Sequence, residues 1–228
     1  DSTHPAYIEF KDDWITMRDL YKGERAVKAK GETYLPATKG MKLDGMESTK
    51  PGYESYNAYK LRAVFHDYVK EGVEAYIGLM HQKPPTIELP EAMEPLREKA
   101  TAHGEPLEML LRRINEEQLV TGRLGLLLDL PVTPDPSNPL PYVALYVAET
   151  IRNWDDGEAE EGQSRLNLVI LDESGPIRSK EFEWTTQTKY RVLTLGNPDL
   201  NEEEGTSKST YRVGVFTNAY GKSTDYDP

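Results

Sequence analysis

The spacing of apolar residues changes once along this chain, at Gly122, and this change constrains the fold more than any other feature. Before Gly122, apolar residues recur at helical spacing. After it, short segments rich in Val, Leu, Ile and Tyr alternate with turn-forming stretches such as "TPDPSNPLP" and "GNPDLNEEEG". Helices followed by successive strands predict an α+β fold with a mostly antiparallel or mixed sheet. We therefore expect a helical part at residues 1–121 and a β-rich part at residues 122–228.

Several segments of the helical part have amphipathic patterns. The predicted helices are 5–22, with Phe10, Trp14, Met17 and Tyr21 at helical spacing, 53–80, 91–102 and 106–120, and a short extended piece is expected at 86–89. In the longest, 53–80, one face carries Leu61, Phe65, Tyr68, Gly72, Tyr76 and Leu79. We expect a bend or a close helix contact at Gly72, and helix ends at Gly104 and Gly122.

Residues 31–52, "GETYLPATKGMKLDGMESTKPG", contain Gly and Pro without periodicity and are predicted to be a long extended loop. Loops beyond about 15 residues in compact domains are usually functional or supported by a partner. The strands are expected in "RLGLLLDL", "PYVALYVAETI", "RLNLVILDES", "IRSKEFEWTT", "KYRVLTL" and "TYRVGVF".

Bulk properties exclude several classes of function. The 228 residues suit one sizeable core, and a formal net charge of -12 argues against a grip on nucleic acid by counterion release. The chain has no cysteine, so it forms no disulfide framework and no thiolate metal site. No apolar run approaches the ~20 residues of a membrane span, and we expect an intracellular protein. The start at Asp1 and the turn-like end "STDYDP" suggest a portion of a longer polypeptide.

Two half-motifs resemble those of an ATPase. A Walker B strand is resembled by the apolar run Leu124 to Leu128, which ends in Asp129. A phosphate loop is resembled by "NAYGKSTDYDP", which supplies Lys222, Ser223 and Thr224. A Walker A loop, however, needs glycine five positions before its second glycine, and here that position is Phe216. The phosphate loop is therefore rejected, and Asp129 is interpreted as the solvent-facing polar end of a buried strand. On this interpretation Asp129→Asn leaves assembly largely intact, whereas charging Leu126 or Leu127, whichever faces the core, prevents folding.

Few other residue patterns could indicate a metal site or a catalytic site. No two of the four histidines have the i, i+4 spacing with which a helix holds a metal ion, and we expect surface or capping roles for them. They are His4, His66, His81 and His103. The chain has no G-x-S-x-G elbow, and "DDGEAEEG" lacks the ligand pattern of a calcium loop. We therefore predict no catalytic residue, no metal site and no cofactor.

Tyrosine is abundant, with 14 residues, and "PGYESYNAYKLR" places Tyr53, Tyr56 and Tyr59 along one helix face. Tyrosine combines apolar area with a polar tip, which suits packing against another chain, but the same stripe could instead cover part of its own chain. The candidate oligomer interface comprises this stripe together with Tyr34 and Leu35 of the predicted loop.

Several of these stretches, read in order, resemble the N-terminal half of a family of tailed-phage portal proteins. They are "ETYLPATKGM", "YNAYKLRAVFHDYVKEGVEAYIGLMHQKPPTIELPEAM", "LVTGRLGLLLDLP", "PYVALYVAETIRNWDDGE" and "LNLVILDES". The similarity covers most of residues 30–215, and its most specific pieces are "GLMHQKPPTIELP", "TGRLGLLLDLP" and "ETIRNWDD".

The resemblance implies a non-enzymatic subunit of a ring, usually a dodecamer, at one capsid vertex of the virion. Double-stranded DNA passes through such a ring without sequence-specific binding, and the partners are capsid protein, terminase and head-tail adaptor proteins. Portal subunits have wing, stem and clip parts, and this chain corresponds to the wing, so no DNA-contacting residue is carried over. The subunit would assemble in the host cytoplasm, with no membrane involved. Two alternatives remain open: a ring-binding adaptor or interaction module, and a nucleotide-hydrolysing packaging motor.

Overall fold

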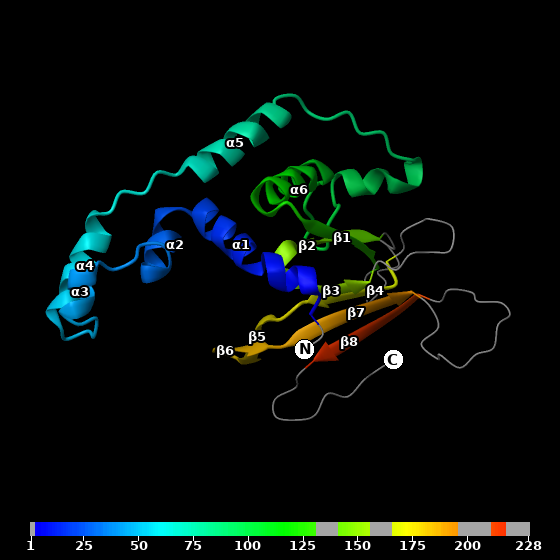
Figure 1. Cartoon of the computed structure of the whole chain (residues 1–228). Coiled ribbons are helices and arrows are strands. Elements are labelled where there is room, and N and C mark those ends of the chain that lie inside the picture. The colour runs from blue at the N-terminus through cyan, green and yellow to red at the C-terminus, as the bar shows by residue number, and fades with distance from the viewer. Residues whose placement is uncertain (1–2, 131–140, 156–165, 196–210, 218–228) are drawn as a thin grey trace. The chain divides into compact units, whose positions relative to one another are not determined.

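The computed structural model describes residues 3–130, 141–155, 166–195 and 211–217. The chain divides into two compact units (Figure 1). One, here called the sheet unit, comprises Asp1–Asp12 and Arg123–Pro228, and the other, the helical unit, comprises Asp13–Gly122. Helix α1 (Pro5–Lys22) begins in the sheet unit and ends in the helical unit. The α+β prediction, with helices first and antiparallel strands after them, is confirmed.

Besides α1, the helical unit contains α2 (Glu24–Ala29), η1 (Gly31–Thr33), α3 (Lys39–Leu43), α4 (Pro51–Arg62), α5 (Tyr68–Met80), η2 (Glu91–Arg97) and α6 (Leu107–Thr121), where η denotes a 3-10 helix. The predicted helices 5–22 and 106–120 are thus confirmed to within one residue. Gly122 caps α6 with a φ of 72°, a left-handed conformation that glycine adopts without steric cost.

Polar contacts join the second half of α1 to α6. The Arg18 guanidinium makes two hydrogen bonds to the Glu117 carboxylate, at 2.9 and 2.8 Å, and the Tyr21 hydroxyl donates to Glu116 at 2.7 Å. A bidentate arginine pair fixes orientation as well as contributing energy. These contacts therefore set the register between the two helices.

The predicted single helix over 53–80 is wrong, because residues 63–67 separate α4 from α5. Ala63 has an extended ψ of 129°, and Asp67, a residue type favoured at N-caps, begins a new helix. Apolar spacing alone did not reveal this break, since two successive helices can preserve it. Helix α5 also runs unbroken through Gly72, where an added Cβ would meet nothing within 4 Å, so the predicted close contact is absent.

The predicted long loop 31–52 is also wrong, since it contains η1 and α3 and ends in the first turn of α4. The Thr38 hydroxyl caps α3 by accepting from the Met41 amide at 3.4 Å. Gly52 lets two backbones approach, because a Cβ there would lie 2.0 Å from the Met41 carbonyl oxygen. Glycine, which favoured a loop in the sequence, is here what permits tight packing of α3 on α4.

One smaller expectation changes as well. The expected helix over 91–102 is the shorter 3-10 helix η2 with Pro95 inside it, while residues 86–89, expected as a short extended piece, lie outside any helix or strand. Proline has no amide hydrogen and clashes with the preceding turn of an α-helix, so this segment does not continue as a regular α-helix.

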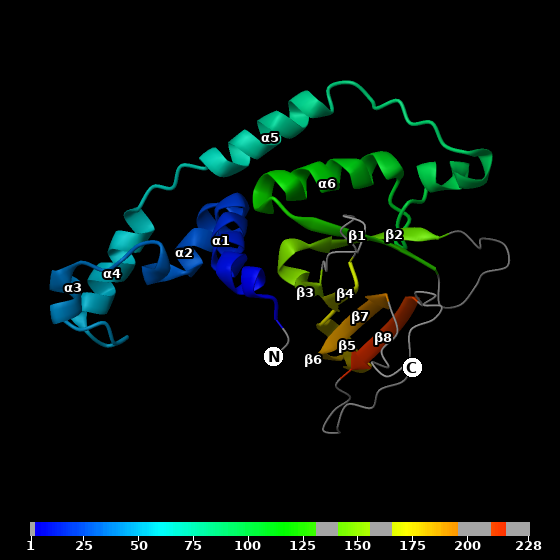
Figure 2. The same ribbon diagram turned by 45° about the vertical axis from the view of Figure 1, so that its right-hand side comes forward.

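The described residues of the sheet unit form three antiparallel groups of strands (Figures 1 and 2). In the first, β1 (Leu124–Asp129) pairs with β2 (Tyr142–Val147). The second has the order β3-β4-β7-β8, with bounds Ile151–Asp155, Leu168–Asp172, Lys189–Leu195 and Tyr211–Thr217. The third is the hairpin of β5 (Gly175–Lys180) and β6 (Glu183–Gln187).

Two expected strands of the sheet unit are each divided. "PYVALYVAETI" forms β2 and the start of β3, separated by the 3-10 turn Ala148–Thr150. "IRSKEFEWTT" forms most of the β5–β6 hairpin. The chain passes from one sheet to another in the first case and turns back on itself in the second. Neither turn carries a Gly-Pro or Asn-Gly signal, which is why a continuous strand was predicted.

The N-terminal residues belong to the sheet unit through specific contacts. The His4 amide donates to the Arg152 carbonyl at 3.0 Å, and the Tyr7 hydroxyl donates to the Glu149 carbonyl at 3.0 Å. Tyr7, Ile151 and Leu171 are buried in this unit. Among the described residues, every helix is too short or too polar to span a bilayer.

Candidate functional site

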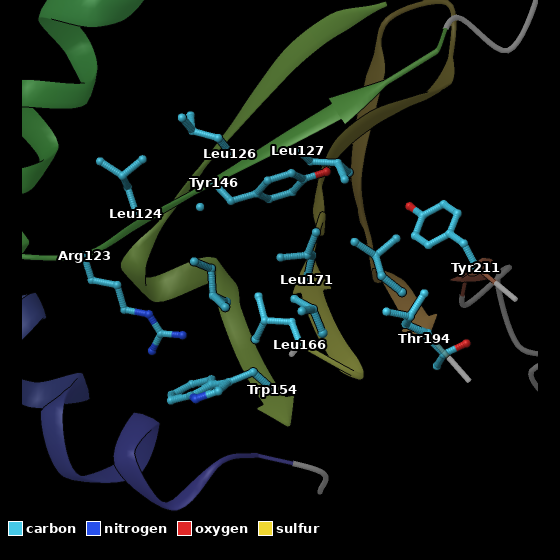
Figure 3. Close-up of a pocket in the computed structure, with 15 residues that line it drawn as sticks. Arg123, Leu124, Leu126, Leu127, Tyr146, Trp154, Leu166, Leu171, Thr194 and Tyr211 are labelled. Carbon is cyan, nitrogen blue, oxygen red and sulfur yellow. The ribbon is translucent and has the colours of Figure 1, made fainter. Parts of the chain in front are cut away.

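A candidate site is an apolar recess of about 500 Å³ in the sheet unit, with walls from both β1–β2 and the four-stranded sheet (Figure 3). Leu124, Leu127, Val169, Leu171 and Leu193 contribute to its lining. Strand alternation produces this wall, because inward-facing residues from several strands meet between the sheets. Arg123 is the one charged residue among the described residues that line the recess.

Arg123 and Trp154 lie together at one end of the recess (Figure 3). The guanidinium carbon of Arg123 is 3.6 Å from the centroid of the Trp154 ring, and the His4 ring stacks on Trp154 with centroids 3.8 Å apart. Burial lowers the pKa of Arg123, and arginine nevertheless stays charged at neutral pH. Through this stack, His4 near the N-terminus packs against Trp154 of β3.

A polar cluster next to the recess joins strands of the two sheets. Arg191 of β7 donates to Asp129, the last residue of β1, and to Glu173 at 2.7 Å. Glu173 also accepts from the Tyr146 hydroxyl of β2 at 2.6 Å and pairs with Lys189 at 2.6 Å. The side chains of Arg191 and Glu173 are 17% and 15% exposed, so these charges are largely removed from water. We call Asp129, Tyr146, Glu173, Lys189 and Arg191 the inter-sheet cluster.

The cluster shifts the pKa values of Glu173 and Tyr146. Burial alone would raise the pKa of Glu173, but hydrogen bonds from Lys189 and Tyr146 and the charge of Arg191 hold it below its usual range. Burial raises the pKa of Tyr146, and its hydrogen bond to Glu173 raises it further. At neutral pH the cluster therefore holds two carboxylates, two cations and one neutral phenol, so its negative and positive charges balance.

The inter-sheet cluster and the recess offer different chemistry. The inter-sheet cluster uses its donors and acceptors on one another, which fixes β1–β2 against the four-stranded sheet. The recess offers apolar surface with one cation at its edge. Within the part of the chain that the structure describes, no group of His, Asp or Glu side chains is arranged to hold a metal ion.

The structure places the sequence-predicted interface residues as follows. Tyr56 is 5% exposed and its hydroxyl donates to the Leu35 carbonyl at 3.0 Å. The Tyr34 hydroxyl donates to Asp19 at 2.8 Å. Tyr53 is 37% exposed, and Tyr59 is half-buried with its ring centroid 6.4 Å from that of Tyr56. Tyr34, Leu35, Tyr56 and Tyr59 thus contact other residues of the chain itself, and a role between subunits stays a prediction.

Asp129 is the last residue of β1, as expected, but it does not simply face solvent. Its carboxylate accepts from Arg191 and from the Tyr142 hydroxyl, and its side chain is 25% exposed. Lys222, Ser223 and Thr224 of the rejected phosphate loop lie outside the described residues. Phe216 lies in β8, so a strand occupies the position at which a Walker A loop would begin.

Sequence reasoning missed Arg191 and Glu173 altogether. Arg191 lies inside the strand "KYRVLTL", and a cation beside Val192 and Leu193 in a strand was a usable signal. Its partners, however, are 62 and 18 residues away along the chain, and no spacing rule connects them. The Nδ1 of His4 accepts from the Ala6 amide at the start of α1, and a ring nitrogen of His81 contacts Asn115 of α6.

Comparison with known proteins gives no family assignment. No protein-family model matches the chain, and no curated protein matches it significantly. Function must therefore be argued from the residues themselves.

Proposed function

We propose that this chain is the wing part of a tailed-phage portal subunit, a structural protein that assembles into a ring through which phage DNA is packaged and ejected. The resemblance extends over most of residues 30–215. The observation that supports the proposal most directly is the junction "TGRLGLLLDLP", one of its most specific pieces. Here α6 ends at the left-handed Gly122 and β1 begins at Leu124, so the matched motif coincides with the central transition of an α+β fold.

Charge is compatible with this proposal. A formal charge of -12 repels a sliding polyanion and so disfavours a tight grip on DNA. The proposed partners are other copies of the chain, capsid protein, terminase and head-tail adaptor proteins. A contact of the segment 31–52 with an adjacent subunit or the capsid shell belongs to the same proposal.

The test is the mass and shape of the particle formed by the complete protein that contains this chain. A portal assembles into a closed ring, which native mass spectrometry and electron microscopy detect. A protein that stays monomeric under assembly conditions, and joins a ring only when one is supplied, is an adaptor and contradicts the proposal.

The packaging-motor alternative has a separate test. A motor hydrolyses ATP and loses turnover when Lys222 and Asp129 are both replaced. The ion pair between Asp129 and Arg191 argues against this outcome, because it occupies the carboxylate that a Mg²⁺ ion would need. Measured turnover that depends on both residues would overturn the portal proposal.

A further inference from the structure

The recess of the sheet unit has the size and composition of a small-molecule site. Ligand pockets usually measure about 300–1,000 Å³ and combine apolar walls with a few placed polar groups, and this recess measures about 500 Å³. Its apolar wall includes Leu127, Leu171 and Leu193. Leu126 and Leu166 also line it and are 53% and 58% exposed, so the recess is open to solvent.

Positive charge lies at one end of this apolar wall. Arg123 is the one charged side chain among the described lining residues, and its guanidinium carbon lies 3.6 Å from the centroid of the Trp154 ring (Figure 3). A guanidinium that stacks on a ring keeps its N–H donors in its own plane, so the stack itself does not use them. Burial lowers the pKa of Arg123, which shows that its charge is partly removed from water. An anion beside such a cation is attracted more strongly than it would be in bulk water.

The other side of the recess disfavours an anion. Tyr211 lies there, across from Arg123 (Figure 3). Burial raises the pKa of Tyr211, and the negative charge of Asp129 raises it further, by more than Arg191 lowers it. Arg191 itself is paired with both Asp129 and Glu173. A ligand with one charged end is therefore oriented, with its anionic group at Arg123.

We propose that the recess binds a small amphipathic anion, an unbranched alkyl carboxylate of the fatty-acid class, with its carboxylate on Arg123 and its chain along the leucine wall. A carboxylate matches the planar fork of a guanidinium, and its single charge is balanced by one arginine. A phosphate monoester carries up to two charges and fits one arginine less well. The inference concerns a single subunit and does not depend on the proposed assembly into a ring.

Membranes present the same chemistry, because they also combine acyl chains with anionic groups. Attraction to an anionic membrane surface, however, takes clusters of about four to eight lysines or arginines. The described lining of the recess supplies one, on a chain whose formal charge is -12. The proposed occupant is therefore a monomeric ligand rather than a bilayer.

The first test compares ligands that differ in one property at a time. Isothermal titration calorimetry measures the binding of octanoate, decanoate and decanol to the complete protein, each below its micelle concentration. We expect decanoate to bind about tenfold more tightly than octanoate, since two more methylene groups are buried. Decanol lacks the charge and should bind about tenfold more weakly than decanoate. Equal affinities for decanoate and decanol, or no binding of either acid, would overturn the inference.

The second test locates the carboxylate. Arg123→Met should lower the affinity for decanoate about tenfold and change that for decanol by less than about twofold. Arg123→Lys keeps the charge and should stay within about threefold of the parent. The matched control is Arg178→Met, because Arg178 also lies over a tryptophan ring, 5.3 Å from the centroid of Trp184, in the β5–β6 hairpin. If decanoate binds to Arg123→Met as it does to the parent, the site is not the one proposed.

A third test uses two exposed leucines of β1 and also decides the case in which Arg123→Met fails to fold. Leu126 is at the rim of the recess, whereas Leu128 is 60% exposed and is not among the described residues that line it. Leu126→Asp places a like charge beside the ligand and should lower the affinity for decanoate about fivefold. Leu128→Asp should leave it unchanged. Equal affinities in the two variants would contradict the proposal.

The last test separates a monomeric ligand from a membrane. We expect the protein to stay in the supernatant when vesicles of phosphatidylglycerol are sedimented. Co-sedimentation that is lost in Arg123→Met, without binding of monomeric decanoate, would assign the recess to a membrane surface and overturn the inference.

Discussion

The inter-sheet cluster of the sheet unit and helix α5 of the helical unit differ in what they leave exposed to water. In the cluster, charged side chains are turned inward and paired, as in the contact of Arg191 with Asp129 and Glu173. On α5, apolar side chains such as Tyr68 and Leu79 are 74% and 69% exposed. The difference lies between these two places and not between whole units, because Phe182 of the sheet unit is 87% exposed.

The largest effect is expected from placing a charge inside the sheet unit. Strand alternation puts Leu127 on the inner face of β1, while Leu126 is 53% exposed. We expect Leu127→Asp to cost about 4 kcal/mol or more, since it buries an unpaired carboxylate, and Leu126→Asp to cost about 1 kcal/mol or less. Urea unfolding followed by circular dichroism measures both. Equal losses would mean that β1 does not alternate as the structure has it.

Breaking the inter-sheet cluster should have the next largest effect. Arg191→Met leaves two carboxylates, Asp129 and Glu173, without their shared cation. Because these side chains retain some exposure, we expect a loss of about 2–4 kcal/mol, slightly below the range for a fully buried pair. Asp129→Asn keeps the shape and should cost about 1 kcal/mol.

The control for this experiment is Arg178→Met, which removes an exposed arginine from the β5–β6 hairpin. Its effect should lie within about 0.5 kcal/mol. If the two arginine variants unfold at the same urea concentration, the cluster does not stabilise the sheet unit.

The helical unit should respond to added volume at one glycine and not at another. Gly52→Ala directs a methyl group at the Met41 carbonyl, so α3 and α4 must move apart, at an expected cost of about 1–3 kcal/mol. Gly40→Ala, within α3, meets nothing within 4 Å and should be neutral or slightly stabilising. Limited proteolysis should cut residues 31–52 faster in the first variant only. Equal cutting in both would argue that this segment is not packed.

The smallest effect is expected on the stability of the sheet unit at acidic pH. The pKa of Glu173 lies below its ordinary value of 4.5 in the folded chain, so its ionised form stabilises the sheet unit. That stabilisation is present above the unfolded pKa and is lost as the pH falls through the folded pKa. We expect melting temperatures measured from pH 5 down to pH 3 to fall less steeply in Glu173→Gln than in the parent. Parallel curves would contradict the depressed pKa.

Sequence periodicity predicted some elements well and failed at others for identifiable reasons. Helices α1 and α6 were placed to within one residue, because each has one clear apolar stripe and a clear end. The stretch 53–80 was misread because apolar residues at helical spacing continue from α4 into α5, where Tyr68, Tyr76 and Leu79 are exposed. The recess and the inter-sheet cluster were not predicted, since their members come from strands distant in the chain.

By itself, the sequence determined the class of the fold and the place where it changes, because helical and strand periods are local properties read over about ten residues. It also carried the resemblance on which the functional proposal depends. Tertiary structure alone decided which apolar stripe of α5 is buried, that Gly52 serves packing and that Arg191 meets Asp129. Each of these depends on what lies opposite a side chain in space, and the free energy of burial or pairing is set by that partner rather than by the neighbours in the chain.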